Sequence, residues 1–306
     1  MEAWSRDLRA ELSPCPSKTN YSTARKLAKM KLKAHLPVVE KMDVERIIGP
    51  HPLPPHPCGI HLAATDQQTA HGVPQRVLDN NSLHLAEFTA AMTQWIVTHH
   101  ASPEAIERDR IRREALARQG LVDPAQRFPT NTDTQKGNWA EIFLAEYVAA
   151  LSNATLPVYR LRYNTNVDQS MKGDDVLAFD LDSNPVRVLI GEAKFRSTPS
   201  KRVVDDLVSA LAKSHSGNIP ASLQFVADRL FESGNNELGA KVAACNALFA
   251  QGRLQLDYVG LLVSSRAVHL HVQKNAKSGV RRLAVMSLGL ENPAGIVADS
   301  YAGVHV

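Results

Sequence analysis

The sequence predicts an α/β fold, and three observations support this prediction. A chain of 306 residues with 44% hydrophobic and 22% charged residues has the composition of a globular protein with a sizeable core. From residue 131 onward, amphipathic helix patterns alternate with short apolar runs typical of buried strands. Before residue 131, helix patterns surround a proline-rich stretch. We therefore expect a mainly helical region over residues 1–130 and an α/β domain over residues 131–306.

Composition and cysteine content exclude several classes of protein. The three cysteines are far apart and odd in number, which excludes a disulfide framework and fits a reducing compartment. No apolar run approaches the roughly 20 residues that a membrane helix needs, and residues 1–20 lack the apolar segment of a signal peptide. We therefore expect a cytoplasmic protein that makes no contact with a membrane.

The net charge of +4 is carried by the N-terminal part of the chain. Residues 1–60 hold 10 Lys and Arg against 6 Asp and Glu, and the remaining 25 basic and 25 acidic residues balance. Much of the basic charge falls in a predicted helix, Thr23–Leu36, which Pro37 ends. A solvated helix face is the simpler interpretation, and a contact with phosphate or an acidic partner is the alternative.

Three more segments precede residue 131. Residues 49–57 are rich in proline and are expected to form an extended loop or linker. Ser82–His99 predicts a helix with one apolar face. Ser102 and Pro103 are typical of a helix start and Gly120 of a helix end, so a second helix is expected over about residues 103–119.

From residue 131 onward, helix and strand patterns alternate. Gly137–Leu151 is strongly amphipathic, and Val203–Lys213 repeats apolar residues at the spacing of a helix. Short apolar runs bounded by turn residues are expected to be strands. The other predicted elements are strands over Val158–Tyr163, Asp175–Leu181 and Val186–Glu192, helices over Ala221–Glu232 and Glu237–Gln251, strands over Leu256–Ser264, Ala267–Val272 and Leu283–Leu288, and a helix over Gly295–Tyr301.

Two neighbouring predicted strands carry the residues that point to chemistry. Asp175 opens the first strand, Asn184-Pro185 forms the turn, and the second strand ends in Glu192-Ala193-Lys194 after an apolar run. Side chains alternate along a strand, so Glu192 and Lys194 share a face, and the Ala193 carbonyl lies near the same edge. Antiparallel pairing would place Asp175 beside them.

Such a set of groups suits a metal-dependent phosphodiesterase. Two carboxylates and a carbonyl form the oxygen-rich site that Mg²⁺ or Mn²⁺ prefers, and carboxylates so close repel unless a cation separates them. A lysine on the same face can orient a water molecule or stabilise charge on a scissile phosphate. An exposed Glu-x-Lys pair and a turn Asp are each common, but their combination around one hairpin favours the metal-dependent site.

These residues resemble the motif of the restriction-endonuclease-like, or PD-(D/E)xK, superfamily. Asp175 matches the first Asp, with Asp174 as the alternative, and Glu192-Ala193-Lys194 matches the second half. The literal Pro-Asp is absent, because Asp174 stands where the proline would be. The resemblance implies a mixed sheet flanked by helices. It also implies that Asp175, Glu192 and the Ala193 carbonyl hold Mg²⁺, with Mn²⁺ possible, and that Lys194 positions the attacking water.

A helix before the motif offers two candidates for a further acid. In the superfamily a glutamate from this helix often joins the site, which implies Glu141 as a catalytic residue, either as an additional metal ligand or as an acid that supports the ligands. Helical periodicity places Glu146 instead on the apolar face with Trp139 and Phe143, where a buried acid would be more unusual. We follow the superfamily pattern and assign the role to Glu141.

A closer resemblance is to the HamA family. It is carried by the Gly137-x-x-x-Glu141-Ile helix, Asn164-Thr165-Asn166, Lys172-Gly173-x-Asp175 and Gly191-Glu192-x-Lys194-Phe195, and it covers about residues 131–290. HamA is the nuclease subunit of the Hachiman anti-phage system, and its C-terminal domain is shared with the AbpA defence protein. The resemblance implies a DNase that works with a helicase-like, HamB-like partner and stays silent until infection.

Other candidate sites have weaker patterns. His51, His56, Cys58 and His61 lie close in sequence, but their spacing is unusual for a zinc site and a polar proline-rich loop is the simpler interpretation. Arg196, Lys201 and Arg202 follow the Glu-x-Lys strand and are candidates for phosphate contacts. In Tyr159–Tyr163 the arginines alternate with apolar residues, as in a DNA-facing or half-buried strand.

The sequence thus predicts a Mg²⁺-dependent endonuclease that acts on DNA under the control of a helicase-like partner. The alternative is a non-catalytic DNA-binding or scaffold subunit that keeps the nuclease fold. The intact Asp, Glu and Lys set argues against this alternative, because a degenerate copy would usually have lost one of the three. The chain lacks a Walker lysine loop and a Gly-x-Gly-x-x-Gly motif, so we expect no nucleotide hydrolysis by this chain itself.

Overall fold

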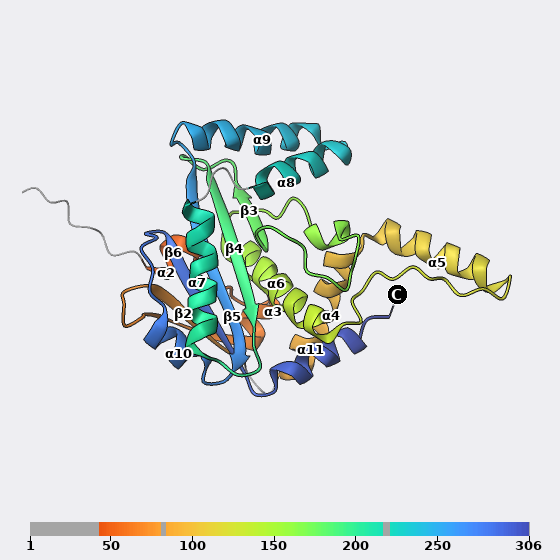
Figure 1. Ribbon diagram of the computed structural model, residues 1–306, viewed down its shortest axis with the longest axis horizontal. Helices are drawn as coiled ribbons and strands as arrows, with labels where there is room; N and C mark the ends of the chain where they lie inside the picture. Colours follow the sequence, from red (N-terminus) through yellow and green to blue (C-terminus); the bar gives the residue numbers. More distant parts are fainter. Residues whose placement is uncertain (1–42, 81–83, 217–220, 306) are drawn as a thin grey trace, which may run out of the picture. The chain divides into compact units, whose positions relative to one another are not determined.

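The described part of the chain forms one six-stranded mixed sheet (Figure 1). This computed structural model describes residues 43–80, 84–216 and 221–305. The sheet has the order β1-β2-β6-β5-β4-β3. Neighbours pair in parallel from β2 to β4, and the β1–β2 and β3–β4 pairs at the two edges are antiparallel. The strands are β1 (Leu62–Gln68), β2 (Pro74–Asn80), β3 (Val176–Asp180), β4 (Arg187–Phe195), β5 (Gln255–Ser265) and β6 (Leu283–Leu290).

Helices cover both faces of this sheet (Figure 1). On one face lies α6 (Thr132–Leu151), with α4 (Leu85–His100) and α11 (Pro293–Ala302) packed beside it. On the other face lie α7 (Lys201–Ser216) and α10 (Val268–Asn275). The remaining described helices are α2 (Val44–Ile48), α3 (Pro57–His61), α5 (Pro103–Ala117), the 3-10 turn η2 (Arg160–Tyr163), α8 (Ala221–Glu232) and α9 (Asn236–Ala250). The predicted α/β class, with a mixed sheet flanked by helices, is confirmed.

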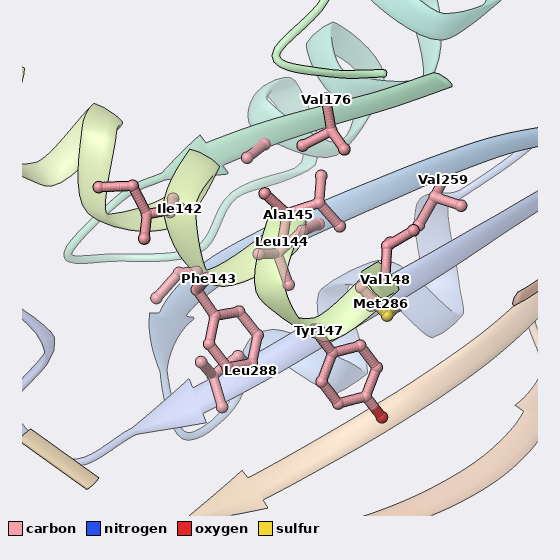
Figure 2. Close-up of a cluster of buried hydrophobic side chains, with 14 of the residues drawn as sticks. Ile142, Phe143, Leu144, Ala145, Tyr147, Val148, Val176, Val259, Met286 and Leu288 are labelled. Carbon is pink, nitrogen blue, oxygen red and sulfur yellow. The ribbon is translucent and has the colours of Figure 1, made fainter. Parts of the chain in front are cut away.

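Helix α6 is the centre of the larger core. Asn131 caps the start of this helix. Its side-chain oxygen accepts hydrogen bonds from the backbone N–H groups of Asp133 and Thr134, which have no partner within the helix. Three aromatic residues one turn apart, Trp139, Phe143 and Tyr147, stack along the helix with ring centroids 5.8 and 5.6 Å apart. Figure 2 shows Phe143 and Tyr147 beside Leu288 of β6. The helix is therefore fixed against the parallel strands.

A glycine in β4 allows α6 to lie close to the sheet. A Cβ atom at Gly191 would lie 2.8 Å from Cβ of Val176 and 2.9 Å from Cδ2 of Leu144. Those distances are shorter than ordinary carbon contacts, so any larger residue would push the helix away from the β3–β4 pair. This close approach brings the first half of α6 toward the end of β4.

Most predicted elements are present with similar bounds, and the differences have physical reasons. Val158–Tyr163 is not a strand, because Arg160 turns inward and residues 160–163 form η2. Ala267–Val272 is not a strand but the start of α10, in which Val268 and Val272 are buried and Leu270 is exposed. In a strand these three residues would share one face, so an exposed Leu270 between two buried valines indicates a helix.

The sheet also includes a hairpin that the sequence did not predict. Strands β1 and β2 come from the region 1–130 that was expected to be mainly helical, and β2 pairs with β6. The sheet therefore crosses the boundary predicted at residue 130. The helix predicted over Thr23–Leu36 lies outside the described residues. No helix in the described part of the chain combines the length and apolar character that crossing a membrane requires.

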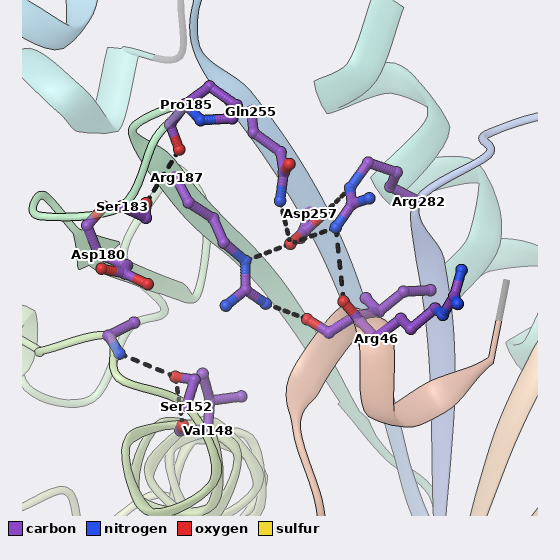
Figure 3. A network of polar contacts seen from close by, with 12 residues as sticks. Arg46, Val148, Ser152, Asp180, Ser183, Pro185, Arg187, Gln255, Asp257 and Arg282 are labelled. Atoms are coloured by element: carbon purple, nitrogen blue, oxygen red, sulfur yellow. Dashed lines mark hydrogen bonds and ion pairs between the residues drawn. The ribbon is translucent and has the colours of Figure 1, made fainter.

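A buried aspartate holds together the end of the sheet at which β4 begins. Asp257 of β5 is fully buried and pairs with Arg187 of β4 and Arg282, which lies just before β6 (Figure 3). The same two arginines also donate to the last carbonyls of α2, those of Ile47 and Arg46. The network therefore joins α2 to three strands and satisfies carbonyls that have no partner within the helix.

We predict that Asp257→Ala lowers the free energy of unfolding by about 3–5 kcal/mol, because it leaves two arginines without their buried counter-charge. Urea denaturation followed by circular dichroism measures this loss. The matched control is Asp205→Ala, which removes an exposed partner of Lys201 and should cost less than about 0.5 kcal/mol. Equal losses in the two variants would show that the Asp257 network adds little to stability.

Candidate active site

The predicted site residues meet at one end of the β3–β4 pair. Asp175 directly precedes β3, and Glu192 and Lys194 lie near the end of β4. The side chains of Val188 and Ile190 face α7, so by alternation Glu192 and Lys194 lie on the same face of β4. The Lys194 Nζ is 2.5 Å from Glu192 Oε1. The Glu-x-Lys pair therefore forms one charged group at the strand end.

Asp175 bonds to β4 through both its backbone and its side chain. Its backbone N–H donates to the carbonyl of Gly191 at 3.1 Å, and its Oδ2 accepts from the backbone N–H of Ala193 at 2.9 Å. The N–H and C=O groups of one residue in a strand point to the same edge, so the Ala193 carbonyl also points toward the side on which Asp175 lies. Asp175, Glu192 and the Ala193 carbonyl are thus neighbours.

Asp174, the alternative to Asp175, is held in a different direction. Its two carboxylate oxygens accept hydrogen bonds from the hydroxyls of Ser214 at 2.6 Å and Ser222 at 2.7 Å. Gly173 before it has φ +112°, a conformation that residues with a side chain rarely adopt. The two adjacent carboxylates therefore have different partners, and only that of Asp175 pairs with β4.

Glu141 of α6 comes near the same group, and it does so through an arginine that the sequence did not single out. Arg160 Nε is 3.2 Å from Glu141 Oε1, and its Nη1 is 3.8 Å from Asp175 Oδ1. Arg160 was expected on a strand as one of two alternating arginines. A signal for its role was absent from the sequence, because its partners lie 15 or more positions away in both directions along the chain.

The competing candidate in α6, Glu146, belongs to another contact. Its Oε1 is 2.7 Å from Nε2 of the buried His99 in α4. Helical periodicity predicted Glu146 as the more buried acid, whereas Glu141 is the residue with only 8% of its surface exposed. The structure therefore brings Glu141, rather than Glu146, near Asp175.

The carboxylates of the site are difficult to ionise together. Burial and the negative charge of Glu192 raise the pKa of Asp175 to about 6. Burial also raises the pKa of Glu141, although the positive charge of Arg160 lowers it in part. A cation placed between Asp175 and Glu192 would relieve this repulsion.

A polar cleft of about 810 Å³ opens over these groups. Its walls come from the start of α6, the segment before β3 and the end of β4. Its basic side chains are Lys136, Lys172, Lys194 and Arg196. Lys201 and Arg202, also predicted as phosphate contacts, do not line this cleft and face Asp205 and Asp206 on α7. The cleft thus combines clustered carboxylates with a basic rim.

The oxygen donors of the site fit a divalent metal ion with few protein ligands. Asp175, Glu192 and the Ala193 carbonyl are hard oxygen groups, which suit Mg²⁺ or Mn²⁺. Within the described ranges, no three His, Cys, Asp or Glu side chains are grouped closely enough to hold a metal ion by themselves. A site built here therefore relies on two carboxylates, a backbone carbonyl and water.

The histidines near the proline-rich segment do not form a second centre. His51 Nδ1 is 2.8 Å from the hydroxyl of Tyr147 and its Nε2 is 3.2 Å from the carbonyl of Leu62. His56 accepts a hydrogen bond from the backbone N–H of Cys58 and stacks on Trp95. These side chains have separate structural partners, so the zinc interpretation gains no support.

Comparison with known proteins identifies relatives over most of this sheet. A family model described as HamA matches residues 62–302. The Hachiman protein HamA of Bacillus cereus is 38% identical over 229 residues, which cover 74% of this chain and 82% of that protein. The family match begins at the first residue of β1. It is therefore longer than the 131–290 range expected from the motifs, and it includes the β1–β2 hairpin.

We predict that Asp175→Asn weakens Mn²⁺ binding at least about tenfold, because it removes one of two carboxylates from the site. Asp174→Asn should have a smaller effect, because that carboxylate is engaged by Ser214 and Ser222. Calorimetric titration with Mn²⁺ compares the two variants. A larger loss in Asp174→Asn would mean that the ligand assignment before β3 is wrong by one residue.

Proposed function

Because the chain belongs to the HamA family, we propose that it is the metal-dependent nuclease effector of a bacterial Hachiman anti-phage defence system and hydrolyses DNA phosphodiester bonds. The observation that carries this proposal is the meeting of Asp175, Glu192, the Ala193 backbone and Lys194 at the end of one hairpin. These groups line a cleft with a basic rim. Carboxylates beside a lysine in a basic cleft are suited to an anionic phosphodiester substrate.

The chain supplies a site for Mg²⁺ or Mn²⁺ and the groups around it. Asp175, Glu192 and the Ala193 carbonyl would hold the ion. A bound divalent ion would polarise a phosphoryl oxygen and lower the pKa of a coordinated water. Asp175 is held in place by the backbone N–H of Ala193 at one oxygen, so its other oxygen keeps a fixed direction.

Lys194 is the residue that we propose to position the attacking water. Its ammonium lies on the same face as Glu192 and contacts that carboxylate, so it is fixed within the cleft. It can donate to a water or to a non-bridging phosphate oxygen, and its positive charge stabilises negative charge that develops on phosphorus. Attack by water breaks one P–O bond and yields a phosphate monoester and a hydroxyl end.

Basic side chains around the cleft would bind the DNA backbone. Lys136 lies at the start of α6, Lys172 before β3 and Arg196 after β4, so the basic side chains of the cleft come from three different segments. Contacts of this kind are with phosphate and are independent of base sequence. Binding should therefore weaken as salt concentration rises.

The first prediction from this proposal is that Glu192→Ala and Lys194→Ala each abolish cleavage of plasmid DNA in Mg²⁺. Both residues are partly exposed at a strand end, so their loss should leave the melting temperature nearly unchanged. Gel analysis of nicked and linear plasmid measures the activity, and Lys241→Ala on α9 is a control for loss of an exposed lysine. Full activity in either cleft variant would favour the non-catalytic subunit instead.

The second prediction concerns control by a partner. We propose that a helicase-like protein of the HamB type restrains or directs this nuclease, since an unrestrained sequence-independent DNase would damage its host. Residues 1–41 precede the unit that contains the site, and much of the net positive charge of the chain lies there. They are therefore the candidate segment for docking to the partner.

Deletion of residues 1–41 should abolish the complex with a co-expressed helicase-like partner and preserve Mn²⁺ binding. The deletion must stop before α2, because Ile47 and Ile48 are fully buried and the Asp257 network binds this helix. Size-exclusion chromatography measures the complex and calorimetry measures the metal site. A complex that survives the deletion would place the docking surface elsewhere on the protein.

A further inference from the structure

Arg160 joins two carboxylates and two backbone carbonyls next to the proposed metal site. Only 14% of its side chain is exposed. Its guanidinium faces the carboxylates of Glu141 and Asp175, at 3.2 and 3.8 Å. It also donates to the backbone carbonyl of Met171 at 2.9 Å and to that of Asp174. One guanidinium therefore joins α6 to the segment that leads into β3.

The geometry gives Glu141 a partner other than a metal ion. A guanidinium stays protonated at any pH a protein tolerates, so its charge next to Glu141 is permanent. Glu141 is buried, and a buried carboxylate needs such a partner. Glu192 differs, because its contact is the flexible ammonium of Lys194 within the open cleft.

Glu141 and Glu192 come from different elements that line one cleft. Glu141 lies on α6 and Glu192 on β4, and the guanidinium of Arg160 contacts Glu141 and Asp175. The three carboxylates do not form a three-residue group in the part of the chain that the structure describes. A single ion at Asp175 and Glu192 would therefore have Arg160 between itself and Glu141.

From these contacts we propose that Arg160 is a positioning residue and that Glu141 is its carboxylate partner rather than a ligand of the catalytic metal. Arg160 fixes the backbone of residues 171–174 and thereby the direction in which Asp175 enters the cleft. The site then holds one divalent ion, on Asp175, Glu192 and the Ala193 carbonyl. This inference rests on the proposed function, because it assigns ligands to the proposed metal site.

Calorimetric titration with Mn²⁺ tests the assignment without any measurement of cleavage. Glu141→Gln keeps the size of the side chain and an oxygen that can accept from Arg160, and it removes only the charge. We expect it to bind one Mn²⁺ per chain with an affinity within about threefold of the unmodified protein. Glu192→Gln, the matched change at a proposed ligand, should weaken binding at least about tenfold.

A second pair of variants tests the part played by Arg160. In Arg160→Gln the carboxylate of Glu141 loses its permanent counter-charge and becomes available to a metal ion. The double variant should therefore bind Mn²⁺ at least about tenfold more weakly than Arg160→Gln does. Glu141→Gln in the otherwise unmodified protein should have little effect. A merely structural role of Arg160 would not create this difference. If Arg160→Gln fails to fold, as judged by circular dichroism, the comparison of Glu141→Gln with Glu192→Gln carries the test.

Two results would overturn the inference while leaving the proposed function intact. Equal losses of affinity in Glu141→Gln and Glu192→Gln would make Glu141 a metal ligand. If Glu141→Gln changes the Mn²⁺ affinity by the same factor in the unmodified protein and in Arg160→Gln, then Arg160 does not keep Glu141 from the ion. A third result, no binding of Mn²⁺ to the unmodified protein, would overturn the proposed metal site and this inference together.

Discussion

Electrostatic repulsion between carboxylates is the constraint on which the proposed site depends. Asp175 and Glu192 lie beside each other at the end of one hairpin, and burial together with this repulsion raises the pKa of Asp175. Asp175 accepts from a backbone N–H and lies 3.8 Å from the Arg160 guanidinium, Glu192 contacts the Lys194 ammonium, and Glu141 pairs with Arg160 at 3.2 Å. Asp175 and Glu192 keep oxygen atoms that a divalent ion can use, whereas the closer contact with Arg160 occupies Glu141 permanently.

The fold keeps these charges in place by fixing both ends of β4. At its first residue, Arg187 is bound to the buried Asp257, which also joins β5 and α2. Near its other end, Gly191 lets α6 pack closely against the β3–β4 pair. Between them β4 lies in the sheet with a parallel neighbour on one side and β3 on the other. Packing along the whole strand therefore opposes the repulsion between the carboxylates of Asp175 and Glu192. The two like charges can stay close together in a fixed geometry.

The sequence predicted the parts of the structure that depend on local patterns. The hairpin with its acids and lysine lies within a short segment, so spacing and alternation were enough to bring them together. Spacing and alternation do not predict contacts between segments that are far apart in the sequence. The residues of β1 and β2 are largely polar, and buried Arg76 pairs with Asp66 and with a distant carbonyl. Arg160 resembled an ordinary strand residue, and its neighbours in space come from α6 and from the turn before β3.

The central claim of the proposed function is that the end of the β3–β4 pair is a metal centre, and the grouping of Asp175, Glu192 and the Ala193 backbone in the cleft supports it. Anomalous diffraction from a crystal soaked in Mn²⁺ tests this claim most directly, because it locates the ion without relying on activity. We expect one peak in contact with Asp175, Glu192 and the Ala193 carbonyl. A crystal saturated with Mn²⁺ that shows no peak there, or a peak only at another set of residues, would contradict it.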